Sequence, residues 1–349
     1  MGSRDRKAVT HLCYCYYRLG GCFSHVPAGE RIIIGLFLCS GTPNQLLEGL
    51  RPAWNALTHY TAHQKLELMG GTAEWWALFP ERNTVSDHVH YESFVMSHWL
   101  QPLLYLHLRP GKEEVVVQKL QAAGFAYESV SNNCIALANN SKIEDVIALN
   151  KEAVVQDRCS QQVLDALLQQ TLPQKPTLWD CCAASGGKSI LAHDLLPGVH
   201  ITATDVRASI LHNLRSRFAQ AGIGRYESFV WDCRAKPLDK MFDVVLCDAP
   251  CSGSGTWGRT PEGLHFFAEE KLAHYQQLQQ QISLHAIQSV KKGGYFLYIT
   301  CSVYAQENEA VVQYILNHTK LKLLQQNYYC GYEHRADTLF AALFQLQPD

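Results

Sequence analysis

The sequence lacks the features that mark several classes of protein. Its longest apolar run, Ile32–Cys39, has about half of the roughly 18 residues that a membrane-spanning helix needs. The charged N-terminus is not followed by the apolar core of a signal peptide. There is no internal repeat or low-complexity stretch, and a content of 47% hydrophobic residues excludes a disordered chain. We therefore expect a soluble, cytoplasmic protein with a large core.

The sequence also lacks a basic net charge and a zinc-binding spacing of cysteines. Lys and Arg number 30 against 32 Asp and Glu, so the overall charge does not indicate a nucleic-acid-binding protein. Basic residues do gather in 207–240, which a solvated surface would also explain. The 13 cysteines contain no C-x-x-C pair, so we expect no metal site. Most of these thiols should be small, buried side chains.

Three regions differ in their predicted secondary structure. Residues 1–85 carry apolar residues at helical spacing and predict a helical N-terminal region. Residues 86–150 predict a small α/β subdomain, and residues 151–349 alternate strands with helices. This alternation is typical of an α/β fold with a doubly wound, mostly parallel sheet. The expected strands are 177–183, 200–206, 226–232, 242–249 and 294–301, and the expected helices are 188–196, 208–222 and 269–293.

The first three of these strands end in residues that suit a nucleoside-containing cofactor. After the first strand, small residues allow a ligand close to the backbone, and the next helix offers free N–H groups. Asp205 and Asp232 end the next two strands, where carboxylates can accept ribose hydroxyls and an adenine amino group. Each acid alone is more often a cap or turn residue, but the three strand ends together favour an adenosine-containing cofactor. The candidate loop consists of Cys182, Ala183, Ala184, Ser185, Gly186, Gly187 and Lys188.

The loop is not predicted to bind a nucleoside triphosphate. Gly187-Lys188-Ser189 matches the end of a P-loop, but Cys182 stands where that motif has its first glycine. A tight turn between strand and helix, without any ligand, would also fit this segment.

The fourth and fifth strands bring thiols and a carboxylate to the same edge of the sheet. Asp248 and Cys251 follow the fourth strand, and Cys301 follows the fifth. Methylation of cytosine at carbon 5 needs a thiolate that adds to carbon 6, an acid at ring nitrogen 3, and a base that removes the carbon-5 proton. The three side chains match these roles in number and type, although spacing does not say which thiol attacks. Two ordinary buried cysteines remain the alternative.

With these motifs, the sequence resembles the Sun/Fmu-type (RsmB-like) family of S-adenosylmethionine-dependent RNA cytosine-C5 methyltransferases. The resemblance runs through VQDRCSQ (155–161), CAASGGKS (182–189), FDVVLCDAPCSGSGT (242–256), KKGGYFLYITCSVYAQENEAVV (291–312) and ADTLFAALF (336–344). It implies a Rossmann-like methyltransferase domain that binds S-adenosylmethionine. It also implies that the loop from Cys182 to Lys188, together with Asp205, Asp232 and Asp248, lines the cofactor site. By the same resemblance, Cys301 is the nucleophile and Cys251 assists release of the product.

The resemblance further implies an RNA partner. Residues 3–19 look like part of the helical RNA-binding domain of RsmB-like proteins, so rRNA is the preferred substrate and tRNA the next. Residues 101–150 resemble the family's small α/β element. Ser185 departs from the family's usual proline, which should loosen the loop without removing its N–H donors. Nothing in the sequence requires more than a monomer.

Two further residues could contact the RNA. Trp257 is a candidate to stack on the target base and Arg259 to bind a phosphate, while a Trp in the core is equally compatible with the sequence. Two other functions remain open. Methylation of an exocyclic amine is disfavoured because Ala249-Pro250-Cys251 after Asp248 supplies no aromatic ring and an amine needs no thiol. A non-catalytic RNA-binding or assembly factor is disfavoured because all of the expected catalytic residues are present.

Overall fold

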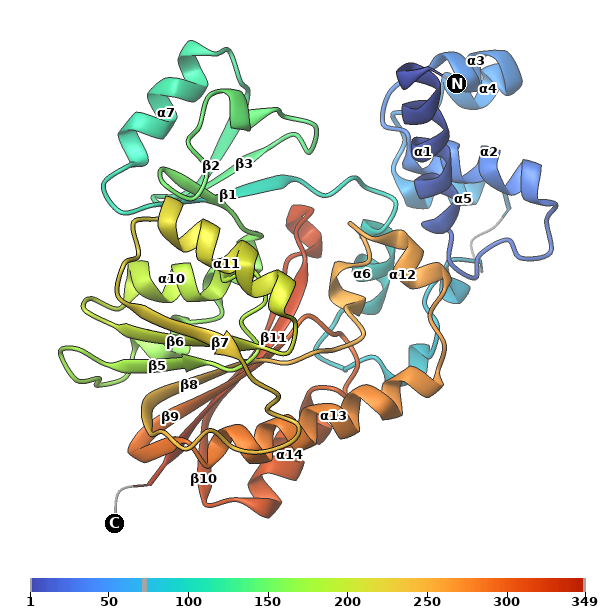
Figure 1. The fold of residues 1–349 in the computed structure, drawn as a ribbon. Coiled ribbons are helices and arrows are strands. Elements are labelled where there is room, and N and C mark those ends of the chain that lie inside the picture. Colours follow the sequence, from blue (N-terminus) through green and yellow to red (C-terminus); the bar gives the residue numbers. More distant parts are fainter. Residues whose placement is uncertain (1, 71–73, 348–349) are drawn as a thin grey trace.

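The carboxy-terminal part of the chain forms a seven-stranded sheet in the order β10-β11-β9-β8-β5-β6-β7 (Figure 1). The strands β9, β8, β5, β6 and β7 are parallel to one another. At the other edge, β11 pairs antiparallel with both β9 and β10. The doubly wound α/β prediction is therefore confirmed. The elements are α8 (Arg158–Gln162), α9 (Asp165–Leu168), β5 (Thr177–Asp180), α10 (Gly187–Leu195), β6 (His200–Asp205), α11 (Ala208–Gln220), β7 (Tyr226–Val230), β8 (Phe242–Asp248), α12 (Pro261–His265), α13 (Glu270–Ile287), β9 (Val290–Thr300), α14 (Glu309–His318), β10 (Leu321–Cys330) and β11 (Thr338–Leu346).

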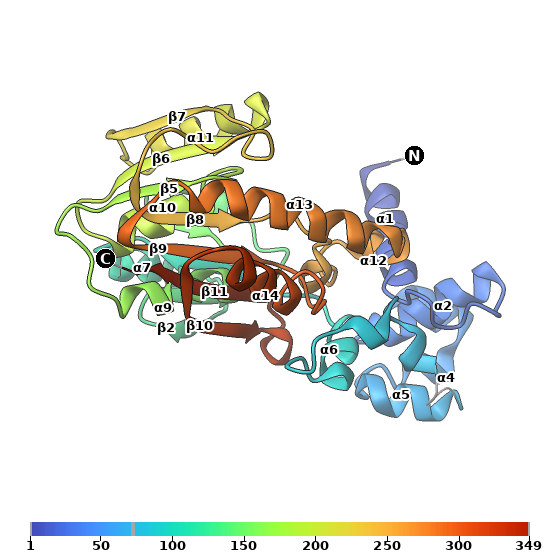
Figure 2. The same ribbon diagram turned by 90° about the horizontal axis from the view of Figure 1, so that it is seen from below.

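Both faces of this sheet are covered, which explains why its central strands read as nearly continuous apolar runs. One core contains Leu211 and Phe218 of α11, packed over Leu246 of β8. The other contains Ile282 of α13, packed over Val245 from the opposite face of the same strand. Figure 2 shows α13 and α14 on the side of the sheet away from α10 and α11. The chain changes face between β5 and β8, and the ends of these strands are where ligands of doubly wound sheets bind.

The structure differs from the predicted elements at the carboxy-terminal side. The helix expected at 269–293 is too long, because α13 ends at Ile287 and Val290 already pairs with Phe242 in the sheet. Gly293 has a φ of +76°, which favours glycine and ends any helical periodicity there. The helix α14 and the strands β10 and β11 were not among the expected elements.

Two smaller units precede the large sheet, and the structure describes residues 2–70 and 74–347. Parts of the predicted first and third regions (1, 71–73 and 348–349) thus lie outside the described residues. The small sheet has the antiparallel order β2-β3-β1-β4. The elements are α1 (Ser3–Tyr17), α2 (Ala28–Cys39), α3 (Gln45–Leu50), α4 (Pro52–Asn55), α5 (Ala62–Leu68), α6 (Tyr91–Ser97), β1 (Leu104–Leu108), α7 (Glu113–Ala122), β2 (Tyr127–Ser131), β3 (Cys134–Leu137) and β4 (Ala153–Val155).

Packing and strand pairing link residues on both sides of the predicted boundaries at 85 and 150. Phe94 and Trp99, at and after α6, belong to the same apolar cluster as Leu19 and Leu38 of the N-terminal helices. The strand β4 at Ala153–Val155 pairs with β1 and so completes the small sheet. The same N-terminal cluster includes Trp257 from the large domain, so the helical unit is packed directly onto it. No helix within the described residues is long and apolar enough to cross a membrane.

Candidate active site

The loop between β5 and α10 turns sharply at the edge of the large sheet. Gly186 has a φ of +81°, and a Cβ atom there would lie 2.7 Å from the ring of Phe218. Glycine is therefore required both by the backbone conformation and by the packing of the loop on α11. Ala184 also adopts a positive φ of 46°. Ser185, expected to loosen this loop, is bound instead by Arg217, whose Nη1 donates to Ser185 Oγ at 2.8 Å and to its carbonyl at 3.1 Å.

The carboxylates at the ends of β6 and β7 are each bound by an arginine two residues later. Asp205 accepts hydrogen bonds from the backbone N–H and the side chain of Arg207, and from the N–H of Ala184 at 3.1 Å. Burial opposes ionisation of Asp205, but the hydrogen bonds from Arg207 outweigh it and lower the pKa. Hydrogen bonds from Arg234 lower the pKa of Asp232 in the same way. Both acids are thus ionised acceptors at neutral pH.

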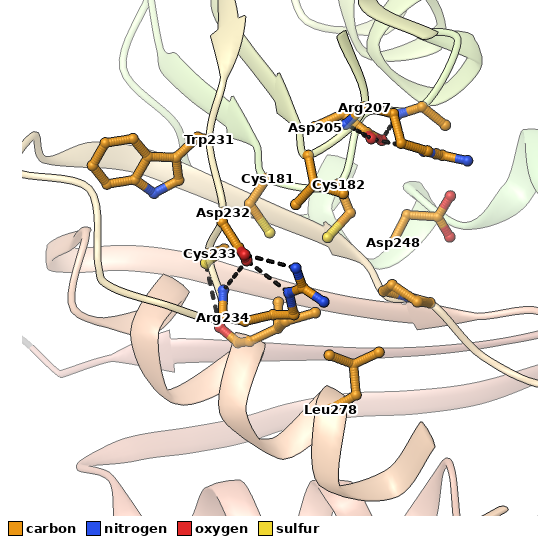
Figure 3. A pocket seen from close by; sticks show the side chains of 14 residues that line it. Cys181, Cys182, Asp205, Arg207, Trp231, Asp232, Cys233, Arg234, Asp248 and Leu278 are labelled. Carbon is orange, nitrogen blue, oxygen red and sulfur yellow. Dashed lines mark hydrogen bonds and ion pairs between the residues drawn. The ribbon is translucent and has the colours of Figure 1, made fainter. Parts of the chain in front are cut away.

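A first cavity of about 380 Å³ opens between these carboxylates and helix α13 (Figure 3). Its walls come from the ends of β5, β6, β7 and β8, and Leu278 and Ile282 of α13 close one side. Among the predicted cofactor residues, those that line it are Cys182, Ala184, Asp205, Asp232 and Asp248.

The two candidate catalytic cysteines meet between the ends of β8 and β9. The Sγ atoms of Cys251 and Cys301 lie 3.4 Å apart, within hydrogen-bonding distance. Both side chains are partly exposed. The hydrogen bond with Cys301, together with burial, raises the pKa of Cys251 well above its usual range. Either sulfur can donate in this hydrogen bond.

Glu307, to which the sequence reasoning gave no role, binds both cysteine loops. The fully buried carboxylate accepts hydrogen bonds from the Ser252 N–H at 2.8 Å and from the Ser302 Oγ at 2.5 Å. Ser252 Oγ and Gln279 Nε2 also donate to it, at 2.5 and 3.0 Å. Ser252 follows Cys251 and Ser302 follows Cys301, so one carboxylate positions both thiols. In the sequence Glu307 lies among the polar residues Gln306, Asn308 and Glu309, so nothing local indicates a buried carboxylate.

A second cavity of about 320 Å³ lies on the other side of Asp248. Its walls include Cys301, Lys188 and Asp248, and the Lys188 Nζ donates to Asp248 Oδ2 at 2.6 Å. Burial lowers the pKa of Lys188, but the charge of Asp248 outweighs this and raises it overall, so the ammonium stays charged. Ala183, Ser185 and Gly187, which were predicted at the cofactor site, line this second cavity, as does Lys188. Asp248 and Ala184 form the wall that the two cavities share.

The proposed RNA contacts of Trp257 and Arg259 are wrong in this structure. Trp257 is only 2% exposed and packs against Phe79 and Phe267, because the loop after Cys251 enters the N-terminal apolar cluster. Arg259 donates to Asp157 at 2.6 Å and to Asp337 at 2.8 Å, which leaves its guanidinium neutralised. In the basic stretch 207–240, arginine and lysine side chains also bind protein groups; these are Arg207, Arg215, Arg217, Arg234 and Lys240.

Comparison with known proteins finds similarity to RNA methyltransferases. Residues 167–341 match the family described as 16S rRNA methyltransferase RsmB/F. Ribosomal RNA small subunit methyltransferase B of Xylella fastidiosa (strain Temecula1) is 29% identical over 283 residues, which are 76% of this chain and 62% of that protein. The 28S rRNA (cytosine-C(5))-methyltransferase of Mus musculus is 34% identical over 151 residues, 42% of this chain and 19% of that protein. The chain thus spans less than two thirds of either relative.

A solved structure shares the fold. The crystal structure of NSun6 from Pyrococcus horikoshii with SFG, an analogue of S-adenosylmethionine, has a TM-score of 0.64 to this chain at 14% identity. The match covers 79% of this chain and 97% of that one. At such low identity, this likeness concerns the fold alone.

Proposed function

Because the chain belongs to the RsmB/F family of 16S rRNA methyltransferases, we propose that it transfers the methyl group of S-adenosylmethionine to carbon 5 of a cytidine in ribosomal RNA. The observation that carries this proposal is the pair of thiols, Cys251 and Cys301, 3.4 Å apart. Cys301 lines the second cavity, which shares the wall formed by Asp248 with the first cavity, and the first cavity suits a nucleoside. The names of the rRNA methyltransferase relatives support the same reaction and substrate class.

The first cavity fits S-adenosylmethionine in size and in chemistry. Its volume of about 380 Å³ is within the usual range for small-molecule sites. Asp205 suits ribose hydroxyls and Asp232 suits the adenine amino group, as in other doubly wound sheets. When bound, S-adenosylmethionine supplies a methyl group attached to a positively charged sulfur.

Asp205 can take a ribose only if Arg207 moves. A carboxylate offers about four acceptor positions. In this structure the backbone and side chain of Arg207 and the N–H of Ala184 use all of them. The side chain of Arg207 is 59% exposed. The side chain of Asp205 is buried, but the exposed guanidinium can move into water, and ribose hydroxyls can then take over its hydrogen bonds to Asp205.

We propose that the second cavity receives the cytosine after it has turned out of its stack. The Cys301 thiol gives its proton to solvent as its sulfur adds to carbon 6, which forms a C–S bond and pushes electrons toward ring nitrogen 3. That nitrogen takes up a proton that Asp248 relays from the Lys188 ammonium hydrogen-bonded to it, and Lys188 regains the proton when the product is released. Carbon 5 then becomes nucleophilic enough to accept a methyl group.

The high pKa of Cys251 supports Cys301 as the nucleophile. It keeps the Cys251 thiol protonated, so we propose that Cys301, rather than Cys251, attacks the base. Once the C–S bond has formed, Cys251 loses its proton to solvent. Its thiolate then removes the proton from carbon 5 while the C–S bond breaks, which returns Cys301 and releases 5-methylcytidine.

Nucleoside mass spectrometry tests this function. Unmodified rRNA and tRNA are incubated separately with the protein and S-adenosylmethionine that carries a labelled methyl group. Labelled 5-methylcytidine in the rRNA alone is the expected result. A label in tRNA alone would overturn the substrate class, and a label on an exocyclic amine would overturn the reaction. No labelled nucleoside from protein shown by calorimetry to bind the cofactor would overturn the catalytic role.

A further inference from the structure

Three thiols other than the proposed catalytic pair lie close together at the first cavity. The Sγ atoms of Cys181, Cys182 and Cys247 all lie within 4.8 Å of one another. Cys181 directly follows β5 and Cys247 lies on β8, and these strands are neighbours in the sheet. Cys182 takes the next position and turns toward the cavity. In Figure 3 the sulfur atoms of Cys181 and Cys182 lie next to each other between Asp232 and Asp248.

A fourth thiol adjoins this group. Cys233 belongs to the same core cluster as Cys181 and Cys247 and lines the same cavity. Its thiol donates a weak hydrogen bond to the carbonyl oxygen of Ile282 at 3.6 Å. We refer to Cys181, Cys182, Cys233 and Cys247 as the thiol cluster.

The spacing of the thiol cluster is close to that of a metal–thiolate site. Sulfurs bound at about 2.3 Å to a tetrahedral Zn²⁺ lie about 3.8 Å from one another. The three mutually close sulfurs of the cluster therefore need to move by 1 Å or less to share one ion, a shift within reach of side-chain rotation. No carboxylate or imidazole belongs to the group, and a donor set of thiols alone selects thiophilic ions.

We propose that the thiol cluster binds a thiophilic cation with a filled d shell, such as Zn²⁺ or Cu⁺. Cys181, Cys182 and Cys247 are the ligands. Sequence spacing could not show this site, because its members come from three separate strand ends and no C-x-x-C pair occurs.

The surroundings of Cys182 favour binding. Cys182 lies at the wall of the first cavity, beside the two other proposed ligands. Cys182 is partly exposed, whereas Cys181 and Cys247 are buried. The first cavity therefore offers the ion a path to the cluster. Since the cofactor is proposed to fill that cavity, bound cofactor should slow the uptake and release of the metal.

Titration of the reduced protein with Cd²⁺ under anaerobic conditions tests the site without RNA or cofactor. One equivalent per chain is expected, with a sulfur-to-cadmium charge-transfer band. Cys181→Ala and Cys247→Ala should each weaken binding by at least about tenfold, the loss seen even for residues that only support metal ligands. Cys159→Ala removes another buried thiol of the same domain and is the matched control. The double variant C251A/C301A removes the catalytic pair and should bind normally.

Three results would overturn the proposal. These are the absence of a stoichiometric site, unchanged binding in Cys181→Ala and Cys247→Ala, or loss of binding in C251A/C301A, which would assign the metal to the catalytic pair. If the cluster variants do not fold, as judged by circular dichroism, X-ray absorption of the zinc-loaded wild type decides. Three or four sulfur ligands support the site, whereas two or fewer refute it.

Discussion

Replacement of Glu307 by Gln should reduce both stability and turnover, since this buried carboxylate supports both cysteine loops. The substitution removes the charge and one acceptor oxygen, and each oxygen of Glu307 receives two hydrogen bonds. Hydrogen bonds to charged groups contribute about 1.5–3 kcal/mol each, so the loss of two at the lower value gives about 3 kcal/mol. Urea unfolding measures this change in the free energy of unfolding.

The effect on catalysis follows from the position of Ser252 and Ser302 beside the two thiols. If the loops relax, Cys301 moves relative to the target cytosine, and a displacement of about 1 Å can lower kcat by about a hundredfold. Affinity for S-adenosylmethionine should change little, because Glu307 is not part of the first cavity. Glu269→Gln, at an exposed position before α13, is the control. A variant that loses stability but keeps its kcat would refute the positioning role, and an unchanged stability would refute the hydrogen-bond argument.

Three further outcomes are expected. Cys301→Ala should abolish methyl transfer and the covalent RNA adduct, whereas Cys251→Ala should keep the adduct and stall release of the RNA. A denaturing gel with labelled RNA detects the adduct, and the opposite pattern would invert the two roles. Asp205→Ala should weaken S-adenosylmethionine binding by about tenfold or more in calorimetry. Arg207→Ala should leave the affinity unchanged or higher. Weaker binding by both variants would contradict the idea that Arg207 and the ribose compete for Asp205. Burial lowers the pKa of His98 from 6.5 to about 4, so the folded protein keeps this ring neutral while the unfolded chain takes up a proton below pH 6.5. Stability present above pH 6.5 should therefore fall by about 2 kcal/mol at pH 5, and urea unfolding of His98→Phe with the same pH profile as the wild type would contradict this.

The prediction from sequence succeeded where a local pattern carries the information. Runs such as Phe242–Asp248 are apolar because both faces of the sheet are buried, and the residues after them reach the same edge through the parallel topology. The approach of Cys251 to Cys301 follows from the parallel arrangement of the strands that precede them. By contrast, Val290, Lys291 and Lys292 continue the composition of the preceding helix, and only pairing with β8 places them in a strand.

Features that depend on long-range packing could not be predicted. Trp257 follows a catalytic loop, and nothing near it in sequence shows that Phe79 and Tyr304 will enclose its ring. The role of Glu307 likewise depends on two serines, one of which lies 55 residues away. Partners that meet only in the folded state leave no periodic signal in the chain.

The burial of Trp257 also decides how the domains can be separated. The loop that carries Cys251 continues to Trp257, which is inserted among side chains of the N-terminal helices, and to Arg259, which is clamped by Asp157 and Asp337. The helical unit therefore supports the loop that carries Cys251. A separate domain beginning at residue 151 would expose the ring of Trp257 to water and leave this loop without that support. A displacement of the helices would consequently shift Trp257 and, through the loop, the thiol pair.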